Sequence, residues 1–200
     1  SGAIAQAVGD DFTRQPSSAG RVLPLVDVRI EAPDGSILPH GATGEIIVRG
    51  AQIMQGYWNR PDATADCMTE DGYFRTGDIG YLDPDGYLFI VDRKKDIIIR
   101  GGENISCQEL EAAIYEHPAV AEACVFGLPD ERLGELPGAV VYLHPGQSID
   151  EAGLATFLKE RIAGFKVPEK IWFEADNLPR LGTEKIDKVS LRAKYRAVWQ

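Results

Sequence analysis

The hydrophobic pattern of this 200-residue chain changes once, close to Asp92, and this change limits the folds open to it. Before Asp92, β-branched runs such as residues 26–30 and 44–50 are separated by Gly, Pro and Asp. Short strands with turns at this spacing are typical of a small barrel or sandwich. After Asp92, apolar runs at strand spacing and at helix spacing alternate. This second part predicts a separate α+β module of about 100 residues.

Composition excludes several classes of function. The hydrophobic content is 44% and the charged content 26%, which are ordinary values for a globular chain. The net charge is -10, so we expect no nucleic-acid partner, because such binding depends on neutralising phosphates. The three widely spaced cysteines predict neither a disulfide framework nor a metal site, but free thiols in a cytoplasmic protein. No apolar run is long enough to predict a transmembrane segment.

Local signals predict individual elements. The turn at Pro84-Asp85-Gly86 lies between two apolar runs and predicts a β-hairpin. Ser106, with Glu109 three residues later, predicts a capped helix that ends near His117 and Pro118. Asp150 predicts the cap of a second helix that continues to about residue 163. Further strands are predicted at residues 97–99, 119–126, 138–143 and 170–173, and a closing helix at residues 189–198.

Three short motifs carry residue types suited to chemistry: YFRTGD at residues 73–78, DRKKDIIIRGGENIS at 92–106 and LPRLGTEKIDK at 178–188. The carboxylate of Asp78 follows a Thr-Gly turn, where it could accept hydrogen bonds from a vicinal diol or only cap the turn. The adjacent glycines at 101 and 102 allow positive φ and the close approach of a ligand or backbone. A single ammonium such as that of Lys185 could offset phosphate charge, or it could simply be solvated.

In this order the three motifs resemble the C-terminal part of the AMP-forming acyl-CoA synthetases, a branch of the adenylate-forming superfamily. The GGENIS sequence is similar to the corresponding motif of fatty-acyl and aryl-CoA ligases. Residues 44–58 and Lys166 also match patterns of the family. The resemblance implies that residues 1–92 are the β-rich, barrel-like end of a large N-terminal domain. Residues 93–96 would be a hinge, and residues 97–200 a small, mobile α+β lid domain.

The resemblance also implies a reaction of fatty acid metabolism in two steps. ATP and a fatty or aryl carboxylic acid give acyl-AMP and pyrophosphate, and acyl-AMP and CoA then give acyl-CoA and AMP. The phosphate loop, the acyl pocket and most of the Mg2+ site are expected before Ser1, in an N-terminal part of the same enzyme. We therefore expect the 200 residues alone to be inactive in the adenylation step.

Roles for individual residues follow from the resemblance alone. Lys185 would be the catalytic lysine, Asp78 and Arg93 would hold the ribose of the nucleotide, and Lys95 would be the hinge residue. The loop that lines the tunnel for the pantetheine arm of CoA would comprise Gly101, Gly102 and Glu103.

Two features leave alternatives open. Glu184 stands where the family pattern P-R-x-x-x-G-K has glycine, and glutamate does not reach the backbone range of glycine cheaply. In the loop at residues 101–104, the arginine of the acetyl-CoA branch has no counterpart unless Arg100 substitutes for it. Other readings of the whole chain are an adenylation enzyme that loads a carrier protein, a luciferase-like monooxygenase, and a non-catalytic module derived from the family.

Overall fold

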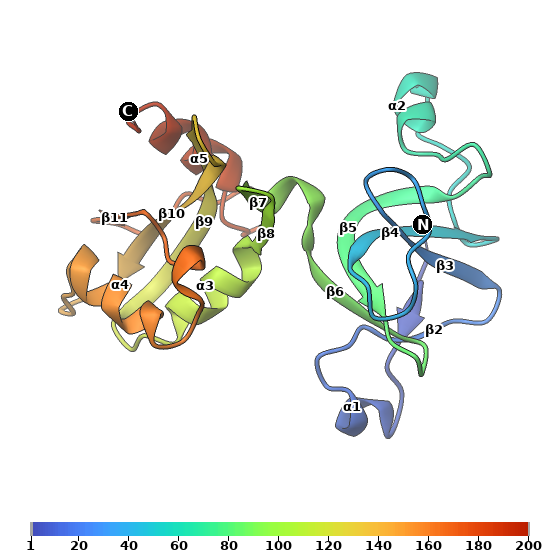
Figure 1. The fold of residues 1–200 in the computed structure, drawn as a ribbon, viewed down its shortest axis with the longest axis horizontal. Helices are drawn as coiled ribbons and strands as arrows, with labels where there is room; N and C mark the ends of the chain where they lie inside the picture. The colour runs from blue at the N-terminus through green and yellow to red at the C-terminus, as the bar shows by residue number, and fades with distance from the viewer. Residues whose placement is uncertain (1, 200) are drawn as a thin grey trace. The chain divides into compact units, whose positions relative to one another are not determined.

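The computed structural model describes residues 2–199, and its backbone forms two compact units, Ser1–Lys95 and Asp96–Gln200 (Figure 1). The division lies inside the short 3-10 turn η1 (Lys94–Asp96), which belongs to the stretch predicted as a hinge. Within residues 2–199, no helix has the length and apolar character needed to cross a membrane. Each unit has its own sheet and its own hydrophobic core.

The first unit is a six-stranded sheet in the order β1-β2-β6-β5-β4-β3, in which all neighbours are antiparallel. This order is an open path, so the predicted barrel-like closure is not confirmed. Two short helices lie outside the sheet, α1 (Asp11–Arg14) and α2 (Pro61–Asp66). The strands are β1 (Ala5–Gln6), β2 (Gly20–Val22), β3 (Val26–Glu31), β4 (Gly44–Gly50), β5 (Phe74–Leu82) and β6 (Tyr87–Arg93).

One face of this sheet is apolar because alternate strand residues point to the same side. The buried members of this core are Ile30, Ile46, Val48, Leu82 and Leu88. The predicted hairpin between β5 and β6 is confirmed, with Leu82 paired to Leu88 across the turn.

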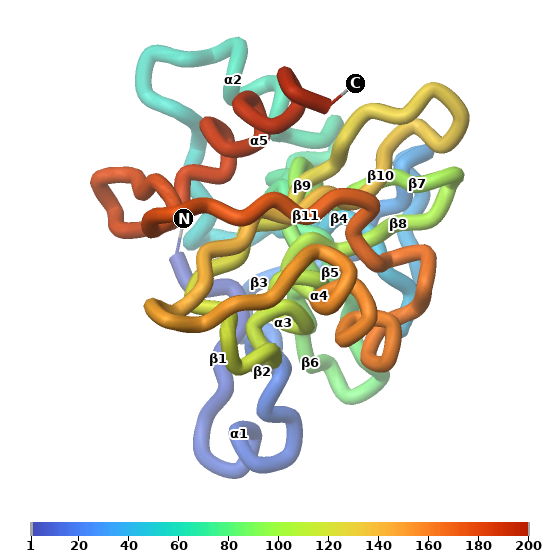
Figure 2. The backbone as a smooth tube through the Cα atoms, turned by 90° about the vertical axis from the view of Figure 1, so that its left-hand side faces the viewer, coloured from blue at the N-terminus to red at the C-terminus, as the bar shows by residue number. Residues whose placement is uncertain are grey.

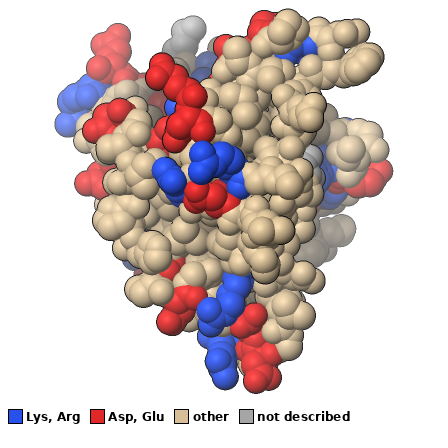
Figure 3. All heavy atoms as spheres, turned by 90° about the vertical axis from the view of Figure 1, so that its right-hand side faces the viewer, with Lys and Arg blue, Asp and Glu red and all other residues tan. Residues whose placement is uncertain are grey.

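On the surface shown in Figure 3, charged side chains form small groups in which both signs occur, separated by uncharged surface.

The second unit contains a five-stranded sheet in the order β11-β10-β7-β8, in which β10 also pairs with β9. The long antiparallel hairpin of β9 and β10 forms its centre, and β11 is parallel to β10. The strands are β7 (Ile97–Arg100), β8 (Glu103–Ser106), β9 (Val120–Asp130), β10 (Gly134–Leu143) and β11 (Lys170–Glu174).

Helices cover both faces of the second sheet (Figures 1 and 2). Along β9, Ala123 and Val125 belong to the core under α3 (Cys107–Tyr115) and α4 (Glu151–Lys159). The intervening Cys124 and Phe126 pack with Leu191 of α5 (Lys188–Arg196) on the opposite face. Burial raises the pKa of Cys124 to about 12, so its free thiol stays protonated. The mixed α+β class predicted from the sequence is confirmed.

Two predicted helix starts are confirmed by their caps. Ser106 Oγ accepts a hydrogen bond from the Glu109 N–H at 3.1 Å, and Asp150 Oδ1 accepts one from the Gly153 N–H at 2.8 Å. The second helix ends at Lys159, so its predicted continuation to residue 163 is wrong. The chain instead forms the 3-10 turn η2 (Gly164–Lys166), from which Lys166 Nζ reaches a Glu109 carboxylate oxygen at 2.6 Å.

The contact between α5 and β11 predicts an acid-sensitive step in unfolding. Glu174 pairs with Lys194 and accepts a hydrogen bond from Tyr195 Oη at 2.6 Å. The Lys194 ammonium, and then the Tyr195 hydroxyl, hold the pKa of Glu174 below its ordinary 4.5. A lowered folded-state pKa contributes stability that is present above the unfolded value and is lost as pH falls through the folded value.

We therefore expect the free energy of unfolding to fall more between about pH 7 and about pH 3.5 in the wild type than in Glu174→Gln. Urea unfolding of both proteins at the two pH values measures this difference. An equal loss in both proteins would show that Glu174 does not contribute to acid sensitivity.

Candidate functional site

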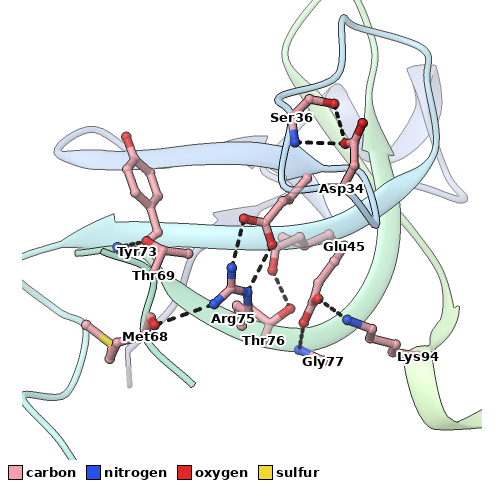
Figure 4. Close-up of polar contacts among 12 residues, drawn as sticks. Asp34, Ser36, Glu45, Met68, Thr69, Tyr73, Arg75, Thr76, Gly77 and Lys94 are labelled. Atoms are coloured by element: carbon pink, nitrogen blue, oxygen red, sulfur yellow. Dashed lines mark hydrogen bonds and ion pairs between the residues drawn. The ribbon is translucent and has the colours of Figure 1, made fainter. Parts of the chain in front are cut away.

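The first half of the YFRTGD motif anchors strand β5. The Tyr73 side chain is fully buried and its Oη donates to Asp27. Burial, and then this hydrogen bond, raise the pKa of the Tyr73 phenol. The Arg75 guanidinium donates to both carboxylate oxygens of Glu31, at 3.0 and 3.1 Å (Figure 4). These contacts fix the strand that carries the rest of the motif.

The second half of the motif turns around a buried carboxylate, that of Glu45 on β4. Gly77, with φ of 72°, donates its N–H to Glu45 Oε1 at 3.2 Å. Lys94 Nζ lies 2.7 Å from the other oxygen, Glu45 Oε2 (Figure 4). Thr76 Oγ1 accepts the Asp78 N–H at 3.1 Å. Glu45 therefore joins the Thr-Gly turn to Lys94, inside the predicted hinge, a role that the sequence did not reveal.

The structure brings Asp78 and Arg93 together. They are directly opposite each other on β5 and β6, and Arg93 Nε lies 3.0 Å from Asp78 Oδ1. The Asp78 side chain is 27% exposed and that of Arg93 is 63% exposed. A carboxylate and a forked guanidinium at one accessible place can accept from and donate to a pair of hydroxyl groups. Lys95 lies two residues further along, exposed in η1.

Gly101 and Gly102 form the two-residue turn of the hairpin between β7 and β8, with Arg100 paired to Glu103. Their φ values are 58° and 92°, which is the region that a type I′ turn requires at both positions. The Gly101 N–H also donates to the Leu133 carbonyl at 2.7 Å. The loop is therefore a tight, exposed turn beside the connection between β9 and β10.

Lys185 lies at the end of a second tight turn, and it is exposed. Arg180 and Ile186 form an isolated antiparallel β-bridge at the base of the turn. Above it, the Leu181 N–H donates to the Lys185 carbonyl at 2.8 Å, and the Glu184 N–H donates to the Leu181 carbonyl at 2.9 Å. Glu184 has a φ of 63°. These bonds describe a three-residue hairpin loop whose last position is left-handed, the position at which glycine is preferred. The structure thus gives a physical reason for the glycine of the family pattern.

This geometry predicts an effect of replacing Glu184. We expect Glu184→Gly to raise the free energy of unfolding by up to about 1 kcal/mol, since a non-glycine residue at positive φ is strained. We expect Glu184→Val to lower it by about 1–2 kcal/mol, because β-branched residues avoid this region. Gly182→Ala is the matched control, since Gly182 has no positive φ and no atom within 4 Å of its added Cβ. Chemical denaturation measures all three, and a neutral Glu184→Val would contradict the assignment.

The Lys185 turn and the Gly101-Gly102 turn lie at opposite ends of one long hairpin. Arg180, at the base of the Lys185 turn, pairs with Glu122 of β9, which is opposite Tyr142 of β10. Arg100, beside the glycine turn, is instead the antiparallel strand partner of Gly134, at the start of β10. Tyr142 and Gly134 are eight residues apart along the strand, which corresponds to about 26 Å. The two predicted site loops of the second unit are therefore kept apart by its sheet.

Within residues 2–199, no three His, Cys, Asp or Glu side chains are grouped closely enough to hold a metal ion. No residue of this part of the chain is therefore assigned to Mg2+. In the first unit, the Asp78 carboxylate with the Arg93 guanidinium can bind the hydroxyl groups of a sugar. In the second unit, the exposed Lys185 ammonium can pair with an anion.

Comparison with known families identifies the family to which the chain belongs. Residues 1–58 match the model of the AMP-binding enzyme family, and residues 109–185 match the AMP-binding enzyme C-terminal domain. The chain belongs to the adenylate-forming AMP-binding enzymes. The YFRTGD and GGENIS motifs lie between the two matched ranges.

Relatives of this family are similar over most of the chain. A feruloyl-CoA synthase of Amycolatopsis sp is 45% identical over 178 residues, which are 89% of this chain and 36% of that protein. A long-chain-fatty-acid–CoA ligase of Mycobacterium tuberculosis is 42% identical over 190 residues, 95% of this chain and 37% of that protein. The structure of o-succinylbenzoate CoA synthetase from Bacillus subtilis with its acyl-adenylate intermediate superimposes with a TM-score of 0.86 at 37% identity, covering 96% of this chain and 38% of the synthetase. The chain thus spans little more than a third of the length of these adenylate-forming relatives.

Proposed function

We propose that this chain is the C-terminal part of an AMP-forming acid–thiol ligase that activates a fatty or aryl acid with ATP and transfers the acyl group to CoA. The observation that carries the proposal is that the Lys185 turn and the Gly101-Gly102 turn are anchored at opposite ends of the hairpin of β9 and β10, at positions about 26 Å apart along β10. Two loops so placed can serve one reaction centre only in turn. This supports an enzyme with two steps between which the second unit changes its position.

In the first step, Asp78 and Arg93 bind the two ribose hydroxyls of ATP, the carboxylate accepting and the guanidinium donating. Lys185 pairs with the carboxylate of the acid and with the α-phosphate, and offsets negative charge as the acid oxygen attacks phosphorus. The flexible stem and point charge of a lysine suit this role at the end of a tight turn. Pyrophosphate leaves and acyl-AMP remains.

In the second step, the second unit turns about Lys95, and the glycine turn replaces the Lys185 turn at the reaction centre. Hinges need only a few residues that absorb a change in φ and ψ. Because Gly101 and Gly102 have no side chains, the backbone can approach the pantetheine arm of CoA closely, with Glu103 at the start of the following strand. The CoA thiol then attacks the acyl carbon and AMP leaves.

We propose that the adenylation step also needs residues from the part of the enzyme that this chain does not cover, which is almost two thirds of the length of the relatives. Acid-dependent exchange of pyrophosphate into ATP tests this proposal in two samples, the complete enzyme and the 200-residue chain alone. We expect exchange by the complete enzyme with at least one fatty or aryl acid and none by the chain alone. Pyrophosphate release above background by the chain alone, with ATP and a fatty acid, would contradict the proposal.

A further inference from the structure

Arg180 connects the core of the second unit to the backbone immediately before Lys185. Its Nη2 forms an ion pair with Glu122 on β9, and its Nη1 donates to the Glu184 carbonyl at 2.6 Å. The hydrogen bond to Glu122 is the main cause that raises the pKa of the Arg180 guanidinium. One planar guanidinium thus holds a carboxylate of the sheet and a carbonyl of the turn together, as a forked donor can.

The carboxylate at the other end of this connection is fixed. Glu122 is 8% exposed, and its second oxygen accepts the Leu178 N–H at 2.6 Å. A buried carboxylate is costly unless its oxygens are paired, and here both partners come from the segment that leads into the Lys185 turn. The sheet therefore determines where this segment begins.

The far side of the turn is held by a different set of contacts. The Asp187 N–H donates to the Pro179 carbonyl at 2.7 Å, and Lys188 Nζ lies 2.8 Å from a Glu111 oxygen. Burial by itself lowers the pKa of an ammonium, but the Glu111 carboxylate outweighs it and raises the pKa of Lys188. These contacts fix the base of the hairpin, whereas Arg180 reaches the strained Glu184 beside the tip.

We propose that Arg180 and Glu122 are positioning residues that hold the Lys185 turn in the conformation used for adenylation. The inference rests on the proposed role of Lys185. Glu184 occupies a left-handed conformation that glutamate disfavours, so a side-chain contact to its carbonyl is the kind of interaction that keeps such a residue in place. A shift of about 1 Å in a reacting group can cost about 100-fold in rate.

The complete enzyme provides the test. We expect Arg180→Ala to slow acyl-adenylate formation by about 10- to 100-fold and to leave thioester formation from supplied acyl-AMP unchanged. Arg196→Ala is the matched control, because Arg196 also forms an ion pair with a glutamate, Glu135, and donates to the Gly127 carbonyl, both at 2.7 Å. This control removes the same kind of contacts from α5 and should leave both steps unchanged. Equal losses in Arg180→Ala and Arg196→Ala would overturn the inference.

A double-mutant cycle separates positioning from general destabilisation. If Arg180 acts through Lys185, Arg180→Ala adds no further loss of adenylation in a Lys185→Ala background, whereas independent effects multiply. Multiplied losses would overturn the inference. If Lys185→Ala alone leaves adenylation unchanged, the proposed role of Lys185 fails instead.

Amide hydrogen exchange reports the position of the turn without any activity. The Glu184 N–H, which donates to the Leu181 carbonyl, should exchange at least about 10-fold faster in Arg180→Ala and at the wild-type rate in Arg196→Ala. Unchanged protection of this amide in Arg180→Ala would overturn the inference whatever the assays give. Glu122→Gln, which keeps an acceptor for the Leu178 N–H and loses the charge, should shift the exchange in the same direction by less.

Discussion

Replacement of Lys185 by alanine in the complete enzyme is expected to slow acyl-adenylate formation by about 100- to 1,000-fold, the usual cost of removing one group that stabilises transition-state charge. Thioester formation from supplied acyl-AMP is expected to stay within about twofold of wild type, because the proposed second step uses the glycine turn at the other end of the sheet. The two half-reactions are measured separately, as pyrophosphate release from ATP and as acyl-CoA formation from synthetic acyl-AMP.

The matched control is Lys159→Ala, which removes another exposed lysine of the same unit, at the end of α4. It is expected to leave both half-reactions unchanged. Equal losses in the two half-reactions of Lys185→Ala would refute the assignment, since Lys185 would then act on the fold of the unit or on both steps. If Lys185→Ala slows neither half-reaction, the catalytic charge must come from a residue other than Lys185.

Replacement of Lys95 by proline is expected to impair the second half-reaction and spare the first. Proline fixes φ near −65° and restricts Lys94 before it, so the backbone of η1 loses the freedom that a hinge needs. We expect thioester formation from acyl-AMP to fall by about 10- to 100-fold, because the glycine turn is then held away from the reacting groups. Adenylation is expected to remain near the wild-type rate.

Lys95→Ala provides the comparison for this variant. Alanine removes the same side chain and leaves φ and ψ free, so both half-reactions should stay near wild type if the backbone is what matters. An equal defect in Lys95→Ala and Lys95→Pro would assign the effect to the side chain. Normal rates for both steps in Lys95→Pro would mean that Lys95 is not the hinge.

Much of the fold could be predicted because its signals are local. The caps at Ser106 and Asp150 and the turn before Tyr87 depend on residues within a few positions of one another, and the structure confirms all three. The barrel-like closure depends on which strands meet at the two edges of the first sheet. Strand pairing between distant segments leaves no local signal in the sequence, so the sequence could not predict whether the first sheet closes into a barrel.

The candidate site residues could also be predicted only where the signal is local. The motifs pointed to Asp78 and Lys185, and the structure adds the contact from Arg93 to Asp78 and the hairpin that holds Lys185. Glu45 and Glu122 were missed as partners of these loops. Each is a carboxylate buried by tertiary contacts, and a sequence does not indicate which glutamates of a strand will be buried and paired.

AMP release by the complete enzyme, measured over short, medium, long and aryl acids with and without CoA, tests the central claim most directly. We expect AMP release that depends on both CoA and one class of acid, which would establish a ligase and name its substrate. Acid-dependent pyrophosphate exchange without CoA-dependent AMP release would contradict it, and would favour an enzyme that loads a carrier protein or a luciferase-like relative.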